Sequence, residues 1–387
     1  MSEQTSARYL AAIAVMTPLI EEHIDWSQRE RRLHPAVVDS FHDAGLFRLM
    51  VPKELGGEGM AEHELLPMIE AVSRIDASAG WNLAIGNGSL GFVRGLDESA
   101  AMQIFATPRA LAAAAVGVGF SIQRVDDGFR VSGRGSFASG CSQANWLSAG
   151  GVLVDANGPV LNPAGAPTVL ISFFPADQAE IVDTWNVTGL RGTGSHDLVV
   201  RNLLVPATRV VDFGRSQQTR FDPFGIIPIP SRLGSHLTAV AIGATWHALE
   251  ELKTLAGAKA SFGTRSVIRD RSDVQIAVGR ATGLVDAARV TATAMIASFT
   301  PQALRGEPLT LEDLVRIRLS YVTAASLCLD AVNLVHAAAG TTTLPADSVI
   351  GRCWRDVHAV SQHVSQQFRH FETAGRVMLG LPPEGPV

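Results

Sequence analysis

The strongest constraint on the fold is a change in the spacing of apolar residues along the chain. From residue 6 to about 115 they recur every three or four positions, so that Val37 and Phe41, for example, would share one helix face. Around Val116 the spacing becomes the alternation typical of strands, and after Leu233 the helical spacing returns. At 387 residues the chain is long enough for two or three packed units. The pattern predicts an α+β fold in the order α, β, α.

Residues 1–115 are expected to form an N-terminal helical domain. Pro35 suits the first turn of a helix and Gly45 suits the position after its end. Residues 9–20 are apolar enough to resemble the core of a signal peptide, but Pro18 interrupts them and two glutamates follow directly. We therefore expect the first turns of an amphipathic helix there.

Residues 116–214 are expected to form a compact middle β domain. Apolar and polar residues alternate on both sides of Asp127-Gly128, a dipeptide that accepts the positive φ values of a type I′ turn. This predicts a hairpin over residues 121–133. Further strands are predicted over 168–174 and 197–205.

The rest of the chain is expected to form a linker and a helical bundle. Residues 215–233 contain three prolines and several polar residues, which favours a linker or lid. Residues 234–387 then carry four long apolar stripes of helical period, which predict a four-helix bundle. The predicted helices span 239–256, 274–299, 311–339 and 348–378.

Composition and charge narrow the classes of function. The net charge is −5, from 32 basic and 37 acidic residues, and gives no reason to expect a nucleic acid or a membrane surface as partner. No run approaches the roughly 20 apolar residues of a membrane span. The three cysteines lack a CxxC pair, which indicates neither disulfides nor a metal site. We expect a cytoplasmic protein that acts on a small organic molecule.

Three strings in this sequence resemble signatures of the acyl-CoA dehydrogenase superfamily. They are residues 45–57 (GLFRLMVPKELGG), residues 185–197 (WNVTGLRGTGSHD) with the Val205-Pro206 pair, and residues 263–280 with Gln275. The resemblance covers nearly the whole chain. It implies the fold of that family, in which an N-terminal α domain and a middle β domain precede a C-terminal four-helix bundle.

The last predicted helix bears on the reaction. Its pair Arg355-Asp356 resembles a pair that, in short-chain members of the family, precedes a Tyr-Glu-Gly string whose glutamate removes the α-proton of the substrate. Here the matching positions hold His363 and Val364, and no carboxylate follows the pair until Glu372. The resemblance thus argues against dehydrogenation, although some branches supply the base from an earlier helix.

The string from Gly133 to Trp146 resembles another branch, the flavin-dependent monooxygenases of this fold. Its residues 137–140 (FASG) match their Phe-x-Ser-Gly string, and residues 191–195 (RGTGS) have the same character. In these relatives the serine that matches Ser139 hydrogen-bonds flavin N5, and the histidine that matches His363 faces the reacting edge. Such enzymes must preserve a C4a-hydroperoxide, and a serine hydroxyl can serve N5 without adding charge. A histidine can deprotonate a phenol or hold the terminal peroxide oxygen.

The resemblance therefore implies two catalytic residues and five flavin-binding ones. Ser139 and His363 are the predicted catalytic pair. The predicted flavin-binding residues are Trp81, Phe137, Ala138, Ser139 and Arg271. Arg271 is chosen among the arginines before Gln275 because a guanidinium can bind a phosphate through two hydrogen bonds. Each residue also has a purely structural interpretation: a strand-end cap for Ser139, a core or surface histidine for His363, a core tryptophan for Trp81 and a solvated helix start for Arg271.

The implied cofactor is reduced FMN or FAD. No Gly-x-Gly-x-x-Gly string follows a strand and opens a helix, so a separate flavin reductase is expected to deliver the reduced flavin. The expected activity is oxygenation of a small, aromatic substrate with O2 by a homotetramer. Phenol hydroxylases of this fold often carry a further histidine in the region of residues 82–90, which has none here, so N- or S-oxygenation stays open. The alternatives are oxidation of an acyl thioester and a catalytically silent, flavin-free subunit.

Overall fold

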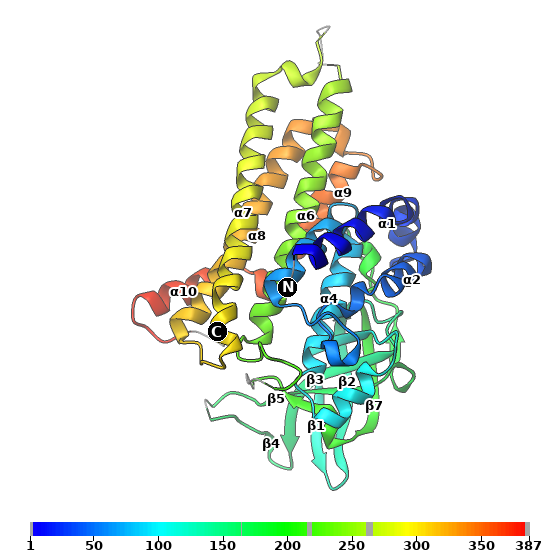
Figure 1. Ribbon diagram of the computed structural model, residues 1–387, viewed down its shortest axis with the longest axis vertical. Helices are drawn as coiled ribbons and strands as arrows, with labels where there is room; N and C mark the ends of the chain where they lie inside the picture. Colours follow the sequence, from blue (N-terminus) through cyan, green and yellow to red (C-terminus); the bar gives the residue numbers. More distant parts are fainter. Residues whose placement is uncertain (1–2, 164, 215–218, 261–265, 384–387) are drawn as a thin grey trace.

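The computed structural model describes residues 3–163, 165–214, 219–260 and 266–383. Figure 1 shows a long helical bundle that rises from a β-sheet, with the N-terminal helices beside the lower half of the bundle. The predicted order of α, β and α parts is confirmed. One large apolar core is shared by the N-terminal helices and the bundle, and smaller cores lie on the two faces of the sheet.

The N-terminal part is helical from its first described residues. Its helices are α1 (Glu3–Glu30), α2 (Pro35–Asp43), α3 (Glu62–Ser73), α4 (Ala77–Val93) and α5 (Glu98–Phe105). Pro35 opens α2 as predicted, and Gly45 follows its end with a φ of 72°. The Asp76 carboxylate accepts a hydrogen bond of 2.8 Å from the Ala79 amide and so caps α4. Almost every residue of α4 is buried, which makes this helix the centre of the molecule.

Within the described residues, eight strands form one sheet in the order β6-β7-β2-β1-β3-β5-β8, with β4 paired to β3. They are β1 (Ala112–Val125), β2 (Gly128–Ala138), β3 (Trp146–Asp155), β4 (Gly158–Pro159), β5 (Val169–Pro175), β6 (Glu180–Val182), β7 (His196–Val205) and β8 (Val210–Asp212). Neighbouring strands are antiparallel except β1 and β3, which run parallel. The sheet thus begins four residues before the predicted boundary at 116.

The predicted hairpin is confirmed, but the predicted turn is wrong. Val125 pairs with Gly128, so the two loop residues are Asp126 and Asp127, and neither has the positive φ that a type I′ turn requires. Gly128 instead starts β2 with a φ of 141°. A side chain there would begin 2.4 Å from the carbonyl oxygen of Val205, so the glycine permits a close approach to β7.

The bundle departs from the prediction at both of its ends. Its helices are α6 (Ile229–Ala258), α7 (Ser272–Leu304), α8 (Leu311–Ala339), α9 (Val349–Ser361) and α10 (Arg369–Met378). Helix α6 begins inside the predicted linker 215–233, whose residues 215–218 lie outside the described part of the chain. The fourth predicted helix, 348–378, is wrong as a single element, because it is divided into α9, a 3-10 turn η8 (Val364–Gln366) and α10.

Helix α8 with the turn after it (Leu311–Thr343) is, among the described helices, long and apolar enough to cross a membrane. Length and composition alone are weak evidence, because the core helix of a bundle passes the same test. Here α8 packs between α6, α7 and α9, and its buried face includes Ile317, Tyr321 and Cys328. This packing accounts for the apolar residues on its buried face.

Candidate active site

Ser139 follows the end of β2, where the chain turns sharply away from the sheet. Phe137 has a φ of 67° and Gly140 a φ of 72°, so two left-handed residues flank the turn. The Gly140 amide donates to the carbonyl oxygen of Thr193 at 2.8 Å, which fixes the turn against the segment before β7. The Ser139 side chain is buried as a result, with 5% of its surface exposed. Left-handed φ is rare for a phenylalanine and commonly marks a functional turn.

A chain of hydrogen bonds runs through the Ser139 hydroxyl. The indole N–H of Trp81 on α4 donates to Ser139 Oγ at 2.9 Å. Ser139 Oγ lies 2.7 Å from Ser195 Oγ, which lies 2.7 Å from Thr193 Oγ1. The Thr193 hydroxyl donates to the carbonyl oxygen of Leu190 at 2.9 Å. The structure therefore brings two predicted residues, Trp81 and Ser139, into direct contact and adds two hydroxyls to which no role had been assigned.

His363 also lies beside Trp81, but not within a helix as predicted. It follows the end of α9 and caps η8, where its Nδ1 accepts hydrogen bonds from the Ser365 amide at 3.2 Å and the Ser365 hydroxyl at 2.8 Å. The centroid of its ring lies 5.9 Å from that of the Trp81 ring, and the two rings meet edge to face. Burial lowers the pKa of His363 to about 4, so the imidazole is neutral near pH 7. Because Nδ1 accepts from an amide, the ring proton is on Nε2.

The remaining predicted flavin-binding residues differ in their placement. Phe137 is exposed, and its ring stands perpendicular to that of Trp185 at 6.1 Å. Ala138 is fully buried in the sheet core. Arg271 is exposed before α7 and paired with Asp273, and the α6–α7 connection lies at the end of the bundle farthest from the sheet (Figure 1). Within one chain Arg271 is thus not brought to the cluster. Residues 263–265 of the predicted phosphate-binding segment lie outside the described residues.

The Leu190 backbone, where the hydroxyl chain ends, is held by a buried carboxyl group. Leu190 has a φ of 54°, and its amide donates to Asp356 Oδ1 on α9 at 2.6 Å. Burial raises the pKa of Asp356 to about 7, and the nearby Asp76 carboxylate adds to the increase. Arg355, the other half of the predicted pair, donates to the carbonyl oxygen of Thr188 at 3.1 Å. Both side chains therefore join the bundle to the segment that leads into β7.

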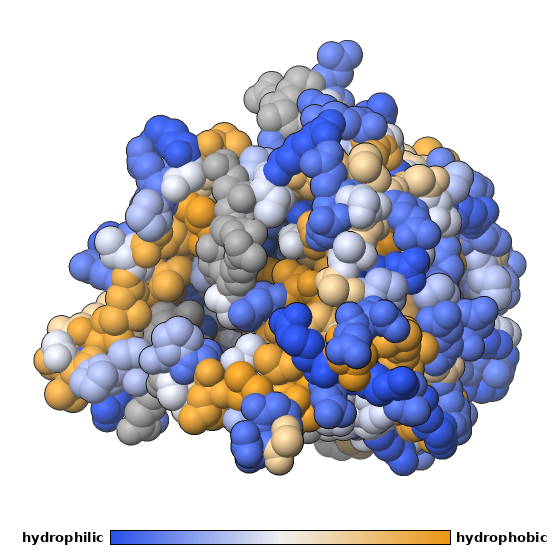
Figure 2. Space-filling view, turned by 90° about the horizontal axis from the view of Figure 1, so that it is seen from below, coloured by the Kyte–Doolittle hydropathy of each residue, from blue (hydrophilic) through white to orange (hydrophobic). Residues whose placement is uncertain are grey.

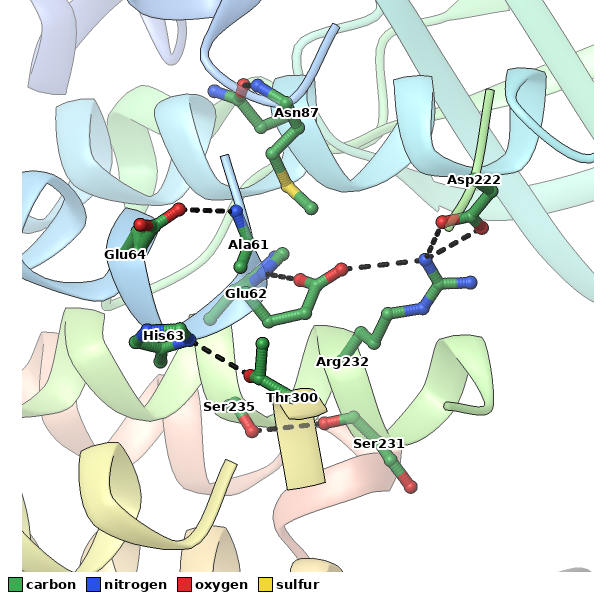
Figure 3. Close-up of polar contacts among 12 residues, drawn as sticks. Ala61, Glu62, His63, Glu64, Asn87, Asp222, Ser231, Arg232, Ser235 and Thr300 are labelled. Atoms are coloured by element: carbon green, nitrogen blue, oxygen red, sulfur yellow. Dashed lines mark hydrogen bonds and ion pairs between the residues drawn. The ribbon is translucent and has the colours of Figure 1, made fainter. Parts of the chain in front are cut away.

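A buried ionic network lies where α3, α4, α6 and the Pro-rich segment before α6 meet. It consists of Glu62, Arg94, Asp222, Arg232 and His236, each 5% exposed or less. Arg232 Nη1 lies 2.9 Å from Asp222 Oδ2, and His236 Nε2 lies 2.6 Å from Glu62 Oε2. Figure 3 shows Arg232 between the two carboxylates. Burial alone would raise the pKa of Glu62, but the hydrogen bond to His236 and the charges of both arginines lower it to about 2.

This network was missed from the sequence, although part of a signal was readable. Arg232 and His236 are four residues apart on an otherwise apolar helix, so their side chains share one face. Nothing in the local sequence indicated that Glu62 and Asp222, from two distant segments, would meet that face. Among the described residues no group of three or more His, Cys, Asp and Glu side chains could hold a metal ion.

The cluster of Trp81, Ser139 and His363 fits the edge of a flavin ring. Ser139 Oγ accepts one hydrogen bond from the Trp81 indole and forms a second with the Ser195 hydroxyl. A serine hydroxyl can form three hydrogen bonds, so one acceptor site on Ser139 Oγ is left for a ligand. The exposed Phe137 ring offers an apolar surface at the same turn. A cavity of about 10 Å³ behind Ser139, lined by Asn82, Gly140 and Gln143 among others, has room for no more than one water molecule.

Comparisons with known proteins agree with this fold. The acyl-CoA dehydrogenase N-terminal domain profile matches residues 2–94, and that of the acyl-CoA dehydrogenase C-terminal domain matches residues 235–368. An indole-3-acetate monooxygenase of Acinetobacter baumannii is 29% identical over 90% of this chain and 87% of its own length. The oxygenase component of an FADH2-dependent resorcinol hydroxylase of Rhizobium sp. is 27% identical over 98% of this chain and 95% of its own length.

A solved structure shares the whole fold. XiaF from Streptomyces sp., in complex with FADH2 and glycerol, superposes with a TM-score of 0.91 over 99% of this chain and 98% of its own, at 23% identity. The fold and these relatives define an oxidoreductase that works with reduced flavin. The chain belongs to the acyl-CoA dehydrogenase superfamily, in its flavin-dependent monooxygenase branch.

Proposed function

We propose that this protein is the oxygenase component of a two-component monooxygenase, which takes reduced flavin from a separate reductase and inserts one oxygen atom of O2 into a small aromatic substrate. The contact of the Trp81 indole with Ser139, beside a neutral His363, is the observation that carries the proposal. When bound, reduced flavin supplies the two electrons that activate dioxygen. The protein contributes the hydrogen bonds, the exclusion of water and the position of the substrate.

The side chains of the cluster divide this work. Ser139 Oγ presents an acceptor to the flavin ring edge without a charge. His363, neutral and with its proton on Nε2, can donate a hydrogen bond to an oxygen atom. Trp81 is 7% exposed and lies against both groups, so it keeps water away from one side of the site.

Dehydrogenation receives no support from the site. The position of the family's glutamate base holds Val364, whose side chain is 54% exposed. The nearest following carboxylate in the sequence, Glu372, lies on α10 beyond the turn that ends α9.

The substrate and the form of flavin are proposed from the relatives. Two of the relatives are named as enzymes that act on indole-3-acetate and on resorcinol, which are both small aromatic molecules. The resorcinol hydroxylase is FADH2-dependent. We therefore propose reduced FAD rather than reduced FMN, and an aromatic ring of one or two cycles as the group that is oxygenated.

A homotetramer in the cytoplasm is part of the proposal. Figure 2 shows apolar side chains gathered on the side of the molecule where α10 and the adjoining ends of α7 and α8 lie. Val364, Phe368, Met378 and Leu379 are each more than half exposed there. An apolar surface of this kind is commonly covered by another subunit, and a second copy could bring Arg271 to a flavin. Light scattering on the purified protein measures the assembly directly.

The activity is tested by product analysis with a matched pair of histidine variants. Protein, FAD, NADH and a general flavin reductase are mixed with indole-3-acetate, indole or resorcinol, and product and hydrogen peroxide are measured. His363→Ala should lower product per NADH at least about tenfold and raise peroxide, since loss of one hydrogen-bond donor to developing charge costs about 10²-fold or more. Its affinity for reduced flavin should change little.

The control is His358→Ala on α9, because that side chain bonds the Trp354 carbonyl and stacks on the Trp354 ring. This variant should keep the product yield of the unmodified protein. Peroxide as the sole product from the unmodified protein with every substrate would contradict the proposal.

A further inference from the structure

The hydroxyl chain at Ser139 has a fixed direction. Each hydroxyl carries one proton, a carbonyl oxygen only accepts and an indole N–H only donates. Because the chain ends at the Leu190 carbonyl, the Thr193 proton is directed there. Ser195 must then donate to Thr193, and Ser139 must donate to Ser195, since each 2.7 Å contact requires one proton between its oxygens. The Trp81 N–H, at the other end, can only donate to Ser139.

Burial enforces this direction. Ser139, Ser195 and Thr193 are at most 5% exposed, so bulk water does not replace a missing partner. Reversal of any one hydroxyl would leave two oxygens face to face without a proton, which costs free energy in a buried site. The acceptor end is rigid, because Leu190 is held by Asp356 at its amide and receives the Trp185 indole N–H at its carbonyl oxygen at 3.1 Å.

The consequence concerns what Ser139 can offer to a bound ring. Its only proton is committed to Ser195, so its remaining capacity is that of an acceptor. Reduced flavin carries a hydrogen on N5 and can donate there, whereas oxidised flavin presents a lone pair at the same atom. If the Ser139 hydroxyl can only accept, it can form a hydrogen bond with N5 of reduced flavin. With oxidised flavin it would face the N5 lone pair without a proton between the two atoms.

We propose that Ser195 and Thr193 are positioning residues that hold Ser139 as a hydrogen-bond acceptor, and that this makes the site select reduced over oxidised flavin. The inference rests on the proposed function, because it assumes that flavin N5 meets Ser139. It assigns a role to the second and third hydroxyls, which do not themselves touch the flavin. Without either hydroxyl, the Ser139 proton is no longer committed to the chain. Ser139 is then free to donate a hydrogen bond to flavin N5.

The test is the ratio of two dissociation constants, measured by anaerobic titration with oxidised and with reduced FAD. The unmodified protein should bind reduced FAD at least about tenfold more tightly, which corresponds to ~1.4 kcal/mol. In Ser195→Ala and in Thr193→Val the ratio should fall to about threefold or less, mainly through tighter binding of oxidised FAD. Thr193→Ser, which restores the hydroxyl, should keep the ratio of the unmodified protein.

Ser172→Ala is the matched control, because Ser172 is a fully buried hydroxyl of the sheet that donates to Ala149 rather than to this chain. It should leave the ratio unchanged. The inference is overturned if Ser195→Ala and Thr193→Val keep the ratio of the unmodified protein, or if both affinities fall together as in a structural defect. Failure of the unmodified protein to bind either flavin would instead overturn the proposed function, and the inference with it.

Discussion

At the scale of single residues, the properties of the site come from neighbours more than from the residues themselves. Ser139 would be an ordinary strand-end serine without the indole N–H on one side and two hydroxyls on the other. His363 is a neutral hydrogen-bonding group because burial lowers its pKa. The sequence could indicate both residues through short strings. It could not indicate the direction of the hydrogen bonds, which depends on Leu190 being held from a distant helix.

Asp356 gives a prediction at this scale that depends on pH. Its pKa is about 7 in the folded chain and 3.8 ordinarily, so the folded state holds the proton between these values. The contribution of this carboxyl to stability is fully present below about pH 4 and is lost as the pH rises to about 7. In Asp356→Asn the side chain does not titrate, so this loss of stability with rising pH is absent. The asparagine side-chain oxygen can still accept the hydrogen bond from the Leu190 amide. The free energy of unfolding of the variant, relative to the unmodified protein, should therefore rise by up to ~1.4 kcal/mol per pH unit over this interval.

Urea unfolding at several pH values measures this difference. Asp127→Asn, at an exposed hairpin position, is the control and should give curves parallel to those of the unmodified protein. Parallel curves for Asp356→Asn would contradict the account of a buried, protonated carboxyl.

At the scale of elements, the helices and strands with a clear period were predictable. Strands β3, β4, β6 and β8 were not predicted, and the last helix was predicted as a single element. Residues 348–378 keep an apolar pattern of helical period throughout, without a glycine or proline at the break. The helix nevertheless ends at Ser361, because the His363 ring accepts from the Ser365 amide and Gln366 bonds the Gly234 carbonyl on α6 at 2.7 Å. Side-chain capping and tertiary contacts thus override the local pattern.

Helix α4 gives the prediction for an element, since it carries Trp81 next to Gly80, which packs closely against α3. A Cβ on Gly80 would lie 1.8 Å from Ser73 Oγ and 3.0 Å from Ser73 Cα on α3. Gly80→Ala should lower the free energy of unfolding by about 1–3 kcal/mol, because the helices must move apart.

The matched control is Gly283→Ala on α7, where nothing lies within 4 Å of the added carbon. It should be stabilising by about 0.5–1 kcal/mol through higher helix propensity. Thermal or urea unfolding measures the stability of both variants. An equal effect of the two substitutions would contradict close packing of α4 on α3.

At the scale of the whole molecule, the buried ionic network joins parts that the sequence keeps far apart. Glu62 belongs to the N-terminal helices, Asp222 to the segment between the sheet and the bundle, and Arg232 to the bundle. The composition allowed a large core, but no local pattern shows which charges a core will enclose. The three-part order was therefore predictable, whereas the electrostatic contacts that fix the parts together were not.

The network gives a prediction for the whole molecule. Glu62→Gln removes the carboxylate between two buried guanidinium groups and should lower the free energy of unfolding by about 3–5 kcal/mol. Because the pKa of Glu62 is lowered to about 2, its contribution is present above about pH 4.5 and is lost as the pH falls toward 2. The variant should therefore differ least from the unmodified protein at low pH.

Glu180→Gln is the control, because its partner Arg201 and Glu180 itself are both more than half exposed. Its effect should stay within about 0.5 kcal/mol at every pH. A Glu62→Gln variant as stable as this control would show that the network does not hold the three parts together.

The central claim is that the cluster of Trp81, Ser139 and His363 serves oxygenation by reduced flavin. The most direct measurement is a single turnover in which the anaerobic complex with reduced FAD is mixed with oxygen-18 gas and a panel of indole, indole-3-acetate and resorcinol. The account predicts a product that contains one oxygen-18 atom and whose yield falls in His363→Ala. Complete recovery of the oxygen as hydrogen peroxide with every substrate, in equal amounts from both proteins, would contradict it.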